Sequence, residues 1–529
     1  MKRRSFIKAA TASTVIPVAL NGMQLRSVNN NALLKALGKR GASDKVLVII
    51  QLNGGNDGLN TLLPLDQYSN LSKARSNVLI PEDKAIGLSD HSEIGFHPQM
   101  SGLNNIYNNK KLNIIQSVGY PQPNFSHFRS TDIWMSASDS NKVLTTGWMG
   151  RYLNEQYPNY PDNYPNSTYP DPLAIQIGPL VSLSFMGPNT SMGMAITDPS
   201  SFYELLDNSS GNVPSTPAGE ELAYIRMLAQ QTNEYADVIK AAAANGSNKS
   251  TKYPISGGRN TLGEQLKIVA KLISGGLSTR VYMVSLGGFD THSAQTDSTD
   301  TTLGNHSALL AHLSQSIEGF QDDLELLGIS DKVTGMTFSE FGRRIQSNAS
   351  GGTDHGAAAP MFVFGDAVQP GVIGNNPSIP STTTVNDNVP MQFDFRQVYA
   401  SVLKDWFELN DAEIKNILGT DFNTLPIFKN NISGIDDIAE YMTQISLRNV
   451  FPNPAKNKTI ISFSTDGGGN LSLVLYNAMG NQLYTFFNKR FSAGTFEHEL
   501  DLRGFSPGNY ILQLHSEMKS CTQTLQILN

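Results

Sequence analysis

The sequence has little cysteine and little charge, and each shortage excludes a class of function. Cys521 is the only cysteine among 529 residues, which excludes an internal disulfide, a Cys₄ zinc site and a thiol-redox framework. Any metal site must therefore use His, Asp, Glu, Asn or a hydroxyl. Charged residues make up 16% of the chain and the net charge is −7, so no basic surface favours nucleic acid as a partner. No segment has the roughly 18 apolar residues of a transmembrane helix.

The N-terminus has the pattern of an export signal. A positively charged start is followed by a short apolar run over residues 9–20, which is too short to anchor the chain in a bilayer. The pair Arg3 and Arg4, followed by Phe-Ile-Lys at 6–8, resembles the twin-arginine consensus. This resemblance implies a signal peptide over residues 1–30 and export of a folded protein by the twin-arginine translocase. An ordinary secretory signal is the alternative.

The C-terminus changes character at residue 449. Alternating apolar and polar residues, separated by Gly, Asn and Pro turns, predict a small β-sandwich with strands near 459–463, 471–476, 508–514 and 522–528. The segments 451–454, 475–480 and 506–510 resemble the C-terminal sorting domain of the type IX secretion system. Over residues 449–529 this implies passage across the outer membrane by that machinery, with release or attachment at the cell surface. A carbohydrate-binding or adhesion sandwich is the alternative.

The central part of the chain alternates buried strands with helices. Near-continuous apolar runs predict strands covered on both faces at 45–52, 112–118, 173–177, 281–286, 333–338 and 361–364. Helical periodicity appears at 218–244, 261–273 and 308–327. This alternation predicts an α/β domain over 45–430, with a mostly parallel sheet flanked by helices and a linker at 431–448. Ligands of such sheets bind beyond the carboxyl ends of the strands.

Carboxylates and histidines follow several of these predicted strands. Asp290 and His292 stand two positions apart, so in an extended segment both side chains point to the same side and can bind one cation. The other candidate metal ligands at strand ends or in glycine-rich loops are Asp57, Glu340, Asp354 and His355. Such a set suits zinc, manganese or calcium. Turn-forming aspartates and packed, hydrogen-bonded histidines are the alternative interpretation.

A further candidate site lies at 123–130, after the second strand. Ser126 stands at the expected start of a helix, where free N–H groups and the helix dipole favour an anionic nucleophile. The alternative is that Ser126 is only an N-cap. Arg129, Arg343 or Arg344 can pair with the oxygens of an anionic ester, and His127 or His355 can assist the leaving group when not bound to metal.

Together these motifs resemble the bacterial family called domain of unknown function 1501. The matching segments are 52–60, 126–128, 288–292, 339–343, 352–356 and 394–400, with Trp406. The resemblance covers roughly residues 1–425 and implies a fold similar to the alkaline phosphatase and sulfatase superfamily. It implies divalent-metal sites at strand ends, with Asp57, Asp290, His292, Glu340 and either Asp354 or His355 as ligands. It places Ser126 at the nucleophile position.

The leading functional hypothesis is therefore metal-dependent hydrolysis of a phosphate or sulfate ester by an exported protein. The alternative is a non-catalytic surface protein that binds glycan or a protein partner. The short Asp-x-His spacing and Phe341 after Glu340 depart from the superfamily pattern and support that alternative. A third hypothesis is a metal-dependent hydrolase of peptides or sugars, and the absence of a His-Glu-x-x-His motif counts against the common metalloproteases.

Overall fold

The chain divides into two compact units. The larger unit is Gly41–Lys429, and the smaller unit combines Met1–Arg40 and Asn430–Asn529. The computed structural model describes residues 44–199, 234–255, 261–429, 445–465, 469–477, 482–491, 494–515 and 520–528. Near the N-terminus it describes only the strand pair β1 (Ala19–Leu20) and β2 (Met23–Gln24). Arg3 and Arg4 lie outside the described residues.

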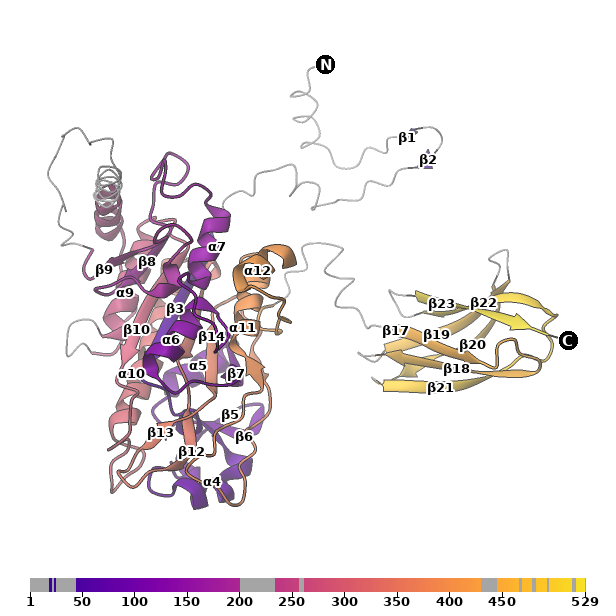
Figure 1. The fold of residues 1–529 in the computed structure, drawn as a ribbon, viewed down its shortest axis with the longest axis horizontal. Helices are drawn as coiled ribbons and strands as arrows, with labels where there is room; N and C mark the ends of the chain where they lie inside the picture. The colour runs from indigo at the N-terminus through magenta and orange to yellow at the C-terminus, as the bar shows by residue number, and fades with distance from the viewer. Residues whose placement is uncertain are drawn as a thin grey trace. The chain divides into compact units, whose positions relative to one another are not determined.

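A nine-stranded sheet forms the centre of the larger unit (Figure 1). Its strand order is β15-β7-β14-β11-β3-β10-β8-β9, with β16 also pairing with β7. The strands are β3 (Val46–Asn53), β7 (Leu112–Gly119), β8 (Ala174–Ile177), β9 (Met194–Ile196), β10 (Val281–Gly287), β11 (Val333–Ser339), β14 (Ala359–Phe364), β15 (Gly371–Ile373) and β16 (Phe393–Asp394). Strand β14 is antiparallel to both of its neighbours, and the other pairings are parallel.

Helices cover both faces of this sheet, which explains why its strands are apolar without alternation. Successive residues of β3 enter opposite cores: Leu47 and Ile49 face one core, and Val48 and Ile50 face the other. The first core includes residues of α6 (His127–Ser136), α7 (Trp148–Gln156), α11 (Phe395–Ser401) and α12 (Asp411–Leu418). The second includes residues of α5 (Ser101–Asn108), α9 (Leu262–Ser274) and α10 (Asn305–Leu327).

Short elements complete the larger unit. They include α3 (Gly58–Thr61), α4 (Tyr68–Arg75), the small sheet of β4 (Leu62–Pro64), β5 (Ile86–Leu88) and β6 (His91–Phe96), and the antiparallel pair β12 (Arg343–Ser347) and β13 (Thr353–His355). Single helical turns lie at Leu65–Gln67, Glu82–Lys84, Leu183–Phe185 and Ser330–Lys332, and Val402–Trp406 continues from α11. Residues 234–245 are also helical.

Three parallel strands end side by side, and this alignment positions the site. In the register of the sheet, Leu52 of β3 lies opposite Ser339 of β11 and Leu286 of β10. The loops that follow these strands therefore leave the same edge of the sheet together. Glu340 directly follows β11, and Asp290 follows β10 by three residues.

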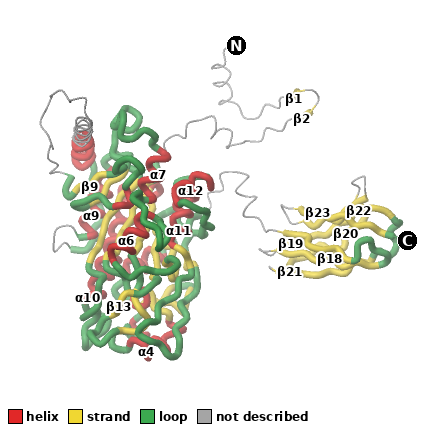
Figure 2. Tube along the Cα trace, in the orientation of Figure 1, coloured by secondary structure: helices red, strands yellow, loops and turns green. Residues whose placement is uncertain are grey.

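The described residues in the C-terminal part of the smaller unit form two antiparallel sheets (Figure 2). One sheet has the order β17-β18-β21 and the other β20-β19-β22-β23. The strands are β17 (Ile445–Phe451), β18 (Lys458–Thr465), β19 (Gly469–Asn477), β20 (Gln482–Phe491), β21 (Gly494–Asp501), β22 (Gly508–His515) and β23 (Ser520–Ile527). Alternate residues such as Ile461 and Leu512 fill one shared core. The predicted fold class, a mostly parallel α/β sheet followed by antiparallel sheets, is confirmed.

Candidate functional site

Three of the predicted site residues converge beyond the carboxyl end of the sheet. Ligand atoms of His127, Asp290 and His355 all lie within 4.8 Å of one another. His127 is the first residue of α6, Asp290 follows β10, and His355 ends β13. His292 joins the group, because its Nε2 atom lies 2.8 Å from His355 Nε2 and 3.2 Å from Asp290 Oδ1. We call His127, Asp290, His292 and His355 the histidine cluster.

The Nδ1 atom of each histidine in the cluster faces a hydrogen-bond acceptor. The acceptors are Glu340 Oε1 for His127 (2.8 Å), the Phe125 carbonyl for His355 (2.7 Å) and Asp354 Oδ1 for His292 (2.9 Å). Carbonyl and carboxylate oxygens accept hydrogen bonds, so each Nδ1 carries the proton and each Nε2 presents a lone pair in the neutral ring. This is the arrangement that orients metal-binding histidines. The donor set of imidazole nitrogens and one carboxylate therefore fits a divalent transition metal.

Asp290 supplies the negative charge at the centre of the cluster. Its Oδ1 atom accepts a hydrogen bond from Arg343 Nη2 (2.8 Å) and lies 3.1 Å from His355 Nε2, and its Oδ2 atom lies 3.4 Å from His127 Nε2. Partial burial raises the pKa of Asp290, but these hydrogen bonds and the charge of Arg343 outweigh it and lower the pKa to about 2. Burial lowers the pKa of His355, which favours its neutral, metal-binding form.

Arg343 holds the loops together. Its side chain is fully buried and donates to the carbonyls of Gly54, Gly55, Phe289 and Thr353 as well as to Asp290. These carbonyls belong to the loops after β3 and β10 and to β13. The guanidinium of Arg343 is thus committed to these acceptors, and its predicted contact with a substrate stays a prediction.

Glu340 lies behind the cluster. Its side chain is 2% exposed, and Oε1 accepts from the Gly54 N–H (2.8 Å) and from His127 Nδ1 (2.8 Å). This oxygen is therefore already committed to orienting His127. The carbonyl of Glu340 accepts from Ser130 and Trp134 of α6, which fixes the helix against β11. Glu340 was predicted as a metal ligand, and the structure gives it the supporting position that second partners of ligating histidines occupy.

Asp57 is also separated from the cluster by its own partners. Both carboxylate oxygens accept from Arg75 Nη1 at 2.9 Å, and Oδ2 accepts from Gln295 Nε2 at 2.6 Å. Asp57 and Arg75 are both fully buried. Burial pushes the pKa of Asp57 upward, but the charge of Arg75 and the hydrogen bonds from Arg75 and Gln295, together with the nearby His306, outweigh burial, and the pKa is lowered. Asp57, predicted as a ligand, is thus the anion of a buried ion pair, and Asp354 likewise contacts His292 from behind.

Ser126 is exposed and lies between two residues that contact the cluster. The carbonyl of Phe125 accepts from His355, and His127 is part of the cluster. Ser126 occupies the N-cap position of α6, but its side chain makes no capping hydrogen bond. The hydroxyl is therefore not used in the way that the N-cap interpretation requires.

Two arginines predicted to bind substrate have different surroundings. Arg129 Nη2 donates to the carbonyls of Asp139, Ser140 and Lys142, so the structure does not bring it to the cluster. Arg344 donates to the carbonyl of His355 at 3.0 Å and lies over the ring of Phe125, with 5.7 Å to its centroid. Arg344 therefore borders the cluster.

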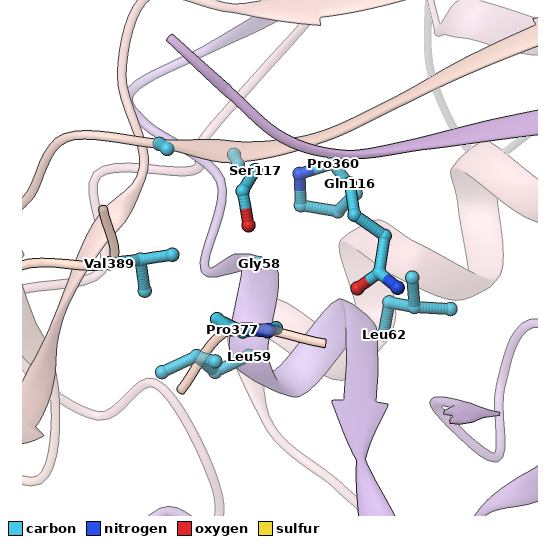
Figure 3. A pocket seen from close by; sticks show the side chains of 10 residues that line it. Gly58, Leu59, Leu62, Gln116, Ser117, Pro360, Pro377 and Val389 are labelled. Atoms are coloured by element: carbon cyan, nitrogen blue, oxygen red, sulfur yellow. The ribbon is translucent and has the colours of Figure 1, made fainter. Parts of the chain in front are cut away.

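A small pocket lies elsewhere, at the ends of β7 and β14 (Figure 3). Its lining consists of Gly58, Leu59, Leu62, Gln116, Ser117, Ala358, Ala359, Pro360, Pro377 and Val389. Most of these side chains are apolar, and none of the predicted site residues is among them. The site predicted from the sequence and this pocket are therefore distinct.

Sequence reasoning missed three buried residues next to the cluster. Gln295, Thr291 and Thr353 form a hydrogen-bonded group at its base, with Gln295 and Thr353 0% exposed. Gln295 follows His292 by three positions, which is the only signal the sequence offers. Glutamine and threonine carry no charge at physiological pH, so neither stands out among candidate acids, bases and charged ligands.

Comparison with protein families identifies two segments. Residues 216–419 match the family described as protein of unknown function (DUF1501). Residues 449–528 match the one described as secretion system C-terminal sorting domain. The chain carries both domains. The sorting domain confirms the predicted C-terminal module and indicates export by type IX secretion to the cell surface or medium.

The DUF1501 segment contributes Asp290, His292 and His355 to the cluster, whereas His127 comes from outside the matched residues. In the part of the chain that the structure describes, no helix is both long enough and apolar enough to cross a membrane. No curated protein matches the chain.

Several solved structures are similar to the chain at low identity. An alkaline phosphatase superfamily protein from Vibrio parahaemolyticus is 9% identical over 81% of this chain and 76% of that one, with a TM-score of 0.32. A sulfatase from Pseudoalteromonas sp. is 10% identical over 89% and 86%, with a TM-score of 0.33. PorZ of Porphyromonas gingivalis, a component of its type IX secretion system, is 17% identical over 20% of this chain, with a TM-score of 0.12.

The coverage of other matches is small. The chain spans 14% of PorZ, 10% of PorU from the same organism and 12% of an FMN-binding β-glucuronidase. At TM-scores this low, no residue's role is carried over from these proteins to the DUF1501 segment.

Proposed function

We propose that the larger unit is a metal-dependent hydrolase of phosphate or sulfate esters that acts outside the cell. The observation that carries the proposal is the convergence of His127, Asp290 and His355, with Ser126 next to His127 in the chain. Three protein ligands with a further position open to solvent are typical of catalytic metal sites. The two imidazoles among these ligands favour zinc or manganese over calcium, which prefers oxygen ligands.

His127, Asp290 and His355 are the residues that would hold the ion. A bound divalent ion would polarise an ester oxygen and lower the pKa of a hydroxyl or water beside it. Asp290 remains ionised down to a pH of about 2, so it can bind a cation at any physiological pH. Glu340 fixes the ring of His127 from behind and holds its Nε2 toward the ion.

The remaining residues are assigned to the ester itself. Ser126 is the proposed nucleophile, because its hydroxyl is not used in capping and the free N–H groups at the start of α6 stabilise an anion there. His292 is 45% exposed and backed by Asp354, so we propose that its doubly protonated form delivers a proton from Nε2 to the leaving group. Arg344, at the border of the cluster, is the proposed contact for a non-bridging oxygen.

The test combines metal analysis with turnover. The purified full chain is expected to contain about one zinc or manganese per chain and to hydrolyse an aryl phosphate or an aryl sulfate. Asp290→Asn should lose the metal and the activity together. Ser126→Ala should keep the metal and lose about 10³-fold or more in kcat, as expected when a nucleophile is removed.

The matched control is His91→Gln. His91 belongs to the same unit, pairs only with Glu93 among the contacts described, and lies outside the cluster. Its replacement should leave metal content and turnover unchanged. Wild-type turnover by Asp290→Asn would refute the hydrolase proposal. Absence of metal and turnover from the native protein, with measurable glycan binding, would favour the non-catalytic alternative.

A further inference from the structure

The two loops that carry the histidine cluster are joined through one buried side chain. Gln295 is 0% exposed, and its Oε1 atom accepts from Thr291 Oγ1 at 3.0 Å and from Thr353 Oγ1 at 2.6 Å. Thr291 stands between Asp290 and His292. Thr353 begins β13, which His355 ends. Each threonine is therefore in a segment that carries part of the cluster.

The backbone confirms that the two segments meet here. The Thr353 N–H donates to the Thr291 carbonyl at 3.1 Å, and the Gln295 N–H donates to the Gly351 carbonyl at 2.9 Å. Thr291 is 4% exposed and Thr353 is 0% exposed. The three side chains are thus closed off from solvent, and water cannot replace a lost hydrogen bond without rearrangement.

The orientation of the Gln295 amide is fixed by its other end. Its Nε2 atom donates to Asp57 Oδ2 at 2.6 Å, and Asp57 is ion-paired with Arg75. An ionised carboxylate only accepts hydrogen bonds, so the amide nitrogen must face Asp57 and the amide oxygen must face the two threonines. Gln295 therefore links the ion pair of Asp57 and Arg75 to the two segments that carry the cluster.

We propose that Gln295 is a positioning residue that sets the distance between the Asp290–His292 loop and the strand that ends in His355. Its amide oxygen accepts a hydrogen bond from one threonine of each segment, while Asp57 accepts from the amide nitrogen and fixes its orientation. The inference deepens the proposed function and rests on it, because the spacing matters only if the cluster binds an ion. Outer partners of this kind typically change metal affinity by about 10- to 100-fold.

The test uses Gln295→Met in the full chain, which keeps the volume and removes all three hydrogen bonds. Zinc affinity is measured by competition with a chromogenic chelator, and the visible spectrum of bound Co²⁺ reports the geometry of the ligands. We expect the zinc dissociation constant to rise by about 10- to 100-fold and the Co²⁺ bands to shift. Gln265→Met is the matched control, because Gln265 is also buried but bonds to the backbone of Ser285.

A double replacement separates positioning from simple loss of stability. Gln295→Glu alone places a second carboxylate against Asp57 and should weaken zinc binding at least as strongly. Gln295→Glu with Asp57→Asn again places a donor against an acceptor between these two positions. It also keeps an oxygen at position 295 that accepts from both threonines. This double variant should recover most of the zinc affinity and the native Co²⁺ spectrum.

The outcomes distinguish the two proposals. A native protein that binds neither zinc nor Co²⁺ refutes the proposed function. Normal binding by the native protein together with an unchanged dissociation constant and Co²⁺ spectrum in Gln295→Met refutes the positioning role alone. Equal losses in Gln295→Met and Gln265→Met would also contradict it, since a general loss of stability would then explain both.

Discussion

Replacing Arg75 with Met should remove a large share of the stability of the larger unit. Arg75 is fully buried at the end of α4 and donates to both oxygens of Asp57. Its guanidinium also donates to the carbonyls of Arg344 (2.6 Å) and Ile345 (2.8 Å) in β12. Methionine fills a similar volume but leaves the Asp57 charge and two carbonyls without these donors.

The size of the loss follows from the burial of both charges. Breaking one partner of a buried ion pair costs about 3–5 kcal/mol, since the remaining charge is left in a medium that solvates it poorly. Domains of this kind are stable by about 5–15 kcal/mol in total. Arg75→Met is therefore expected to lower the urea midpoint strongly. The double variant Arg75→Met with Asp57→Asn should lose less than the sum of the two single losses, because no unpaired charge remains.

The loss should also depend on pH, with a sign set by Asp57. In the native protein the pKa of Asp57 is lowered, so the ion pair contributes stability above the usual aspartate range and loses it as pH falls. Without Arg75, burial raises the pKa of Asp57, and protonation at lower pH relieves the unpaired charge. The difference in unfolding free energy between the native protein and Arg75→Met should therefore shrink as the pH falls from neutral toward the ordinary aspartate range.

Tryptophan fluorescence during urea unfolding is the appropriate assay. The three tryptophans of the chain, Trp134, Trp148 and Trp406, are all buried in one core of the larger unit, so their emission reports on that unit alone. Lys415→Met is the control, because its partner Asp421 is exposed and such a pair contributes little. A loss below about 1 kcal/mol in Arg75→Met, or a loss that stays constant with pH, would show that the buried-pair argument is wrong.

Two further outcomes follow from the same contacts. Burial lowers the pKa of His306 to about 4 and that of His97 to about 3. At a pH between these values and 6.5, both side chains are neutral in the folded protein and bind a proton when it unfolds. Stability should fall as pH drops from 6.5 toward 4, by on the order of 3 kcal/mol for His306, and His306→Gln should flatten this slope in melts followed by tryptophan fluorescence. Gly54 has φ +120°, and a Cβ there would lie 2.3 Å from the Asp290 nitrogen. Gly54→Ala should therefore reduce zinc content, whereas Gly276→Ala, with φ +103° and open space, should not; equal zinc in both variants and the native protein would contradict this.

The strands of the central sheet were predictable from the sequence because both of their faces are covered. The apolar run at 45–52 became β3 (Val46–Asn53), and the run at 333–338 became β11 (Val333–Ser339). Helices α9 and α10 were predictable from their helical periodicity, because one side of each helix packs against the core. The predicted helix at 218–244 lies mostly outside the described residues, which show helix at 234–245.

The site was harder to predict. The sequence shows which residues are of a metal-binding type, but their spacing along the chain does not show which partner each side chain contacts. His127, Asp290 and His355 were all on the predicted list, and the structure brings them together. Glu340 and Asp57 lie behind the cluster, where Glu340 contacts His127 and Asp57 pairs with Arg75. A carboxylate at a strand end looks the same in the sequence whether it faces a cation, a histidine nitrogen or a buried guanidinium. Burial decides among these, and burial depends on segments far away in the chain.

The histidine cluster is assembled from segments that meet only in the folded larger unit. His127 starts α6, Asp290 follows β10 and His355 ends a strand that pairs with β12. The sorting domain has its own hydrophobic core and contributes none of these residues. A protein whose ligands meet only after folding must fold before it can bind an ion, and this gives a physical reason for the predicted export in the folded state. By the same reasoning, loss of the sorting domain after secretion would leave the cluster complete.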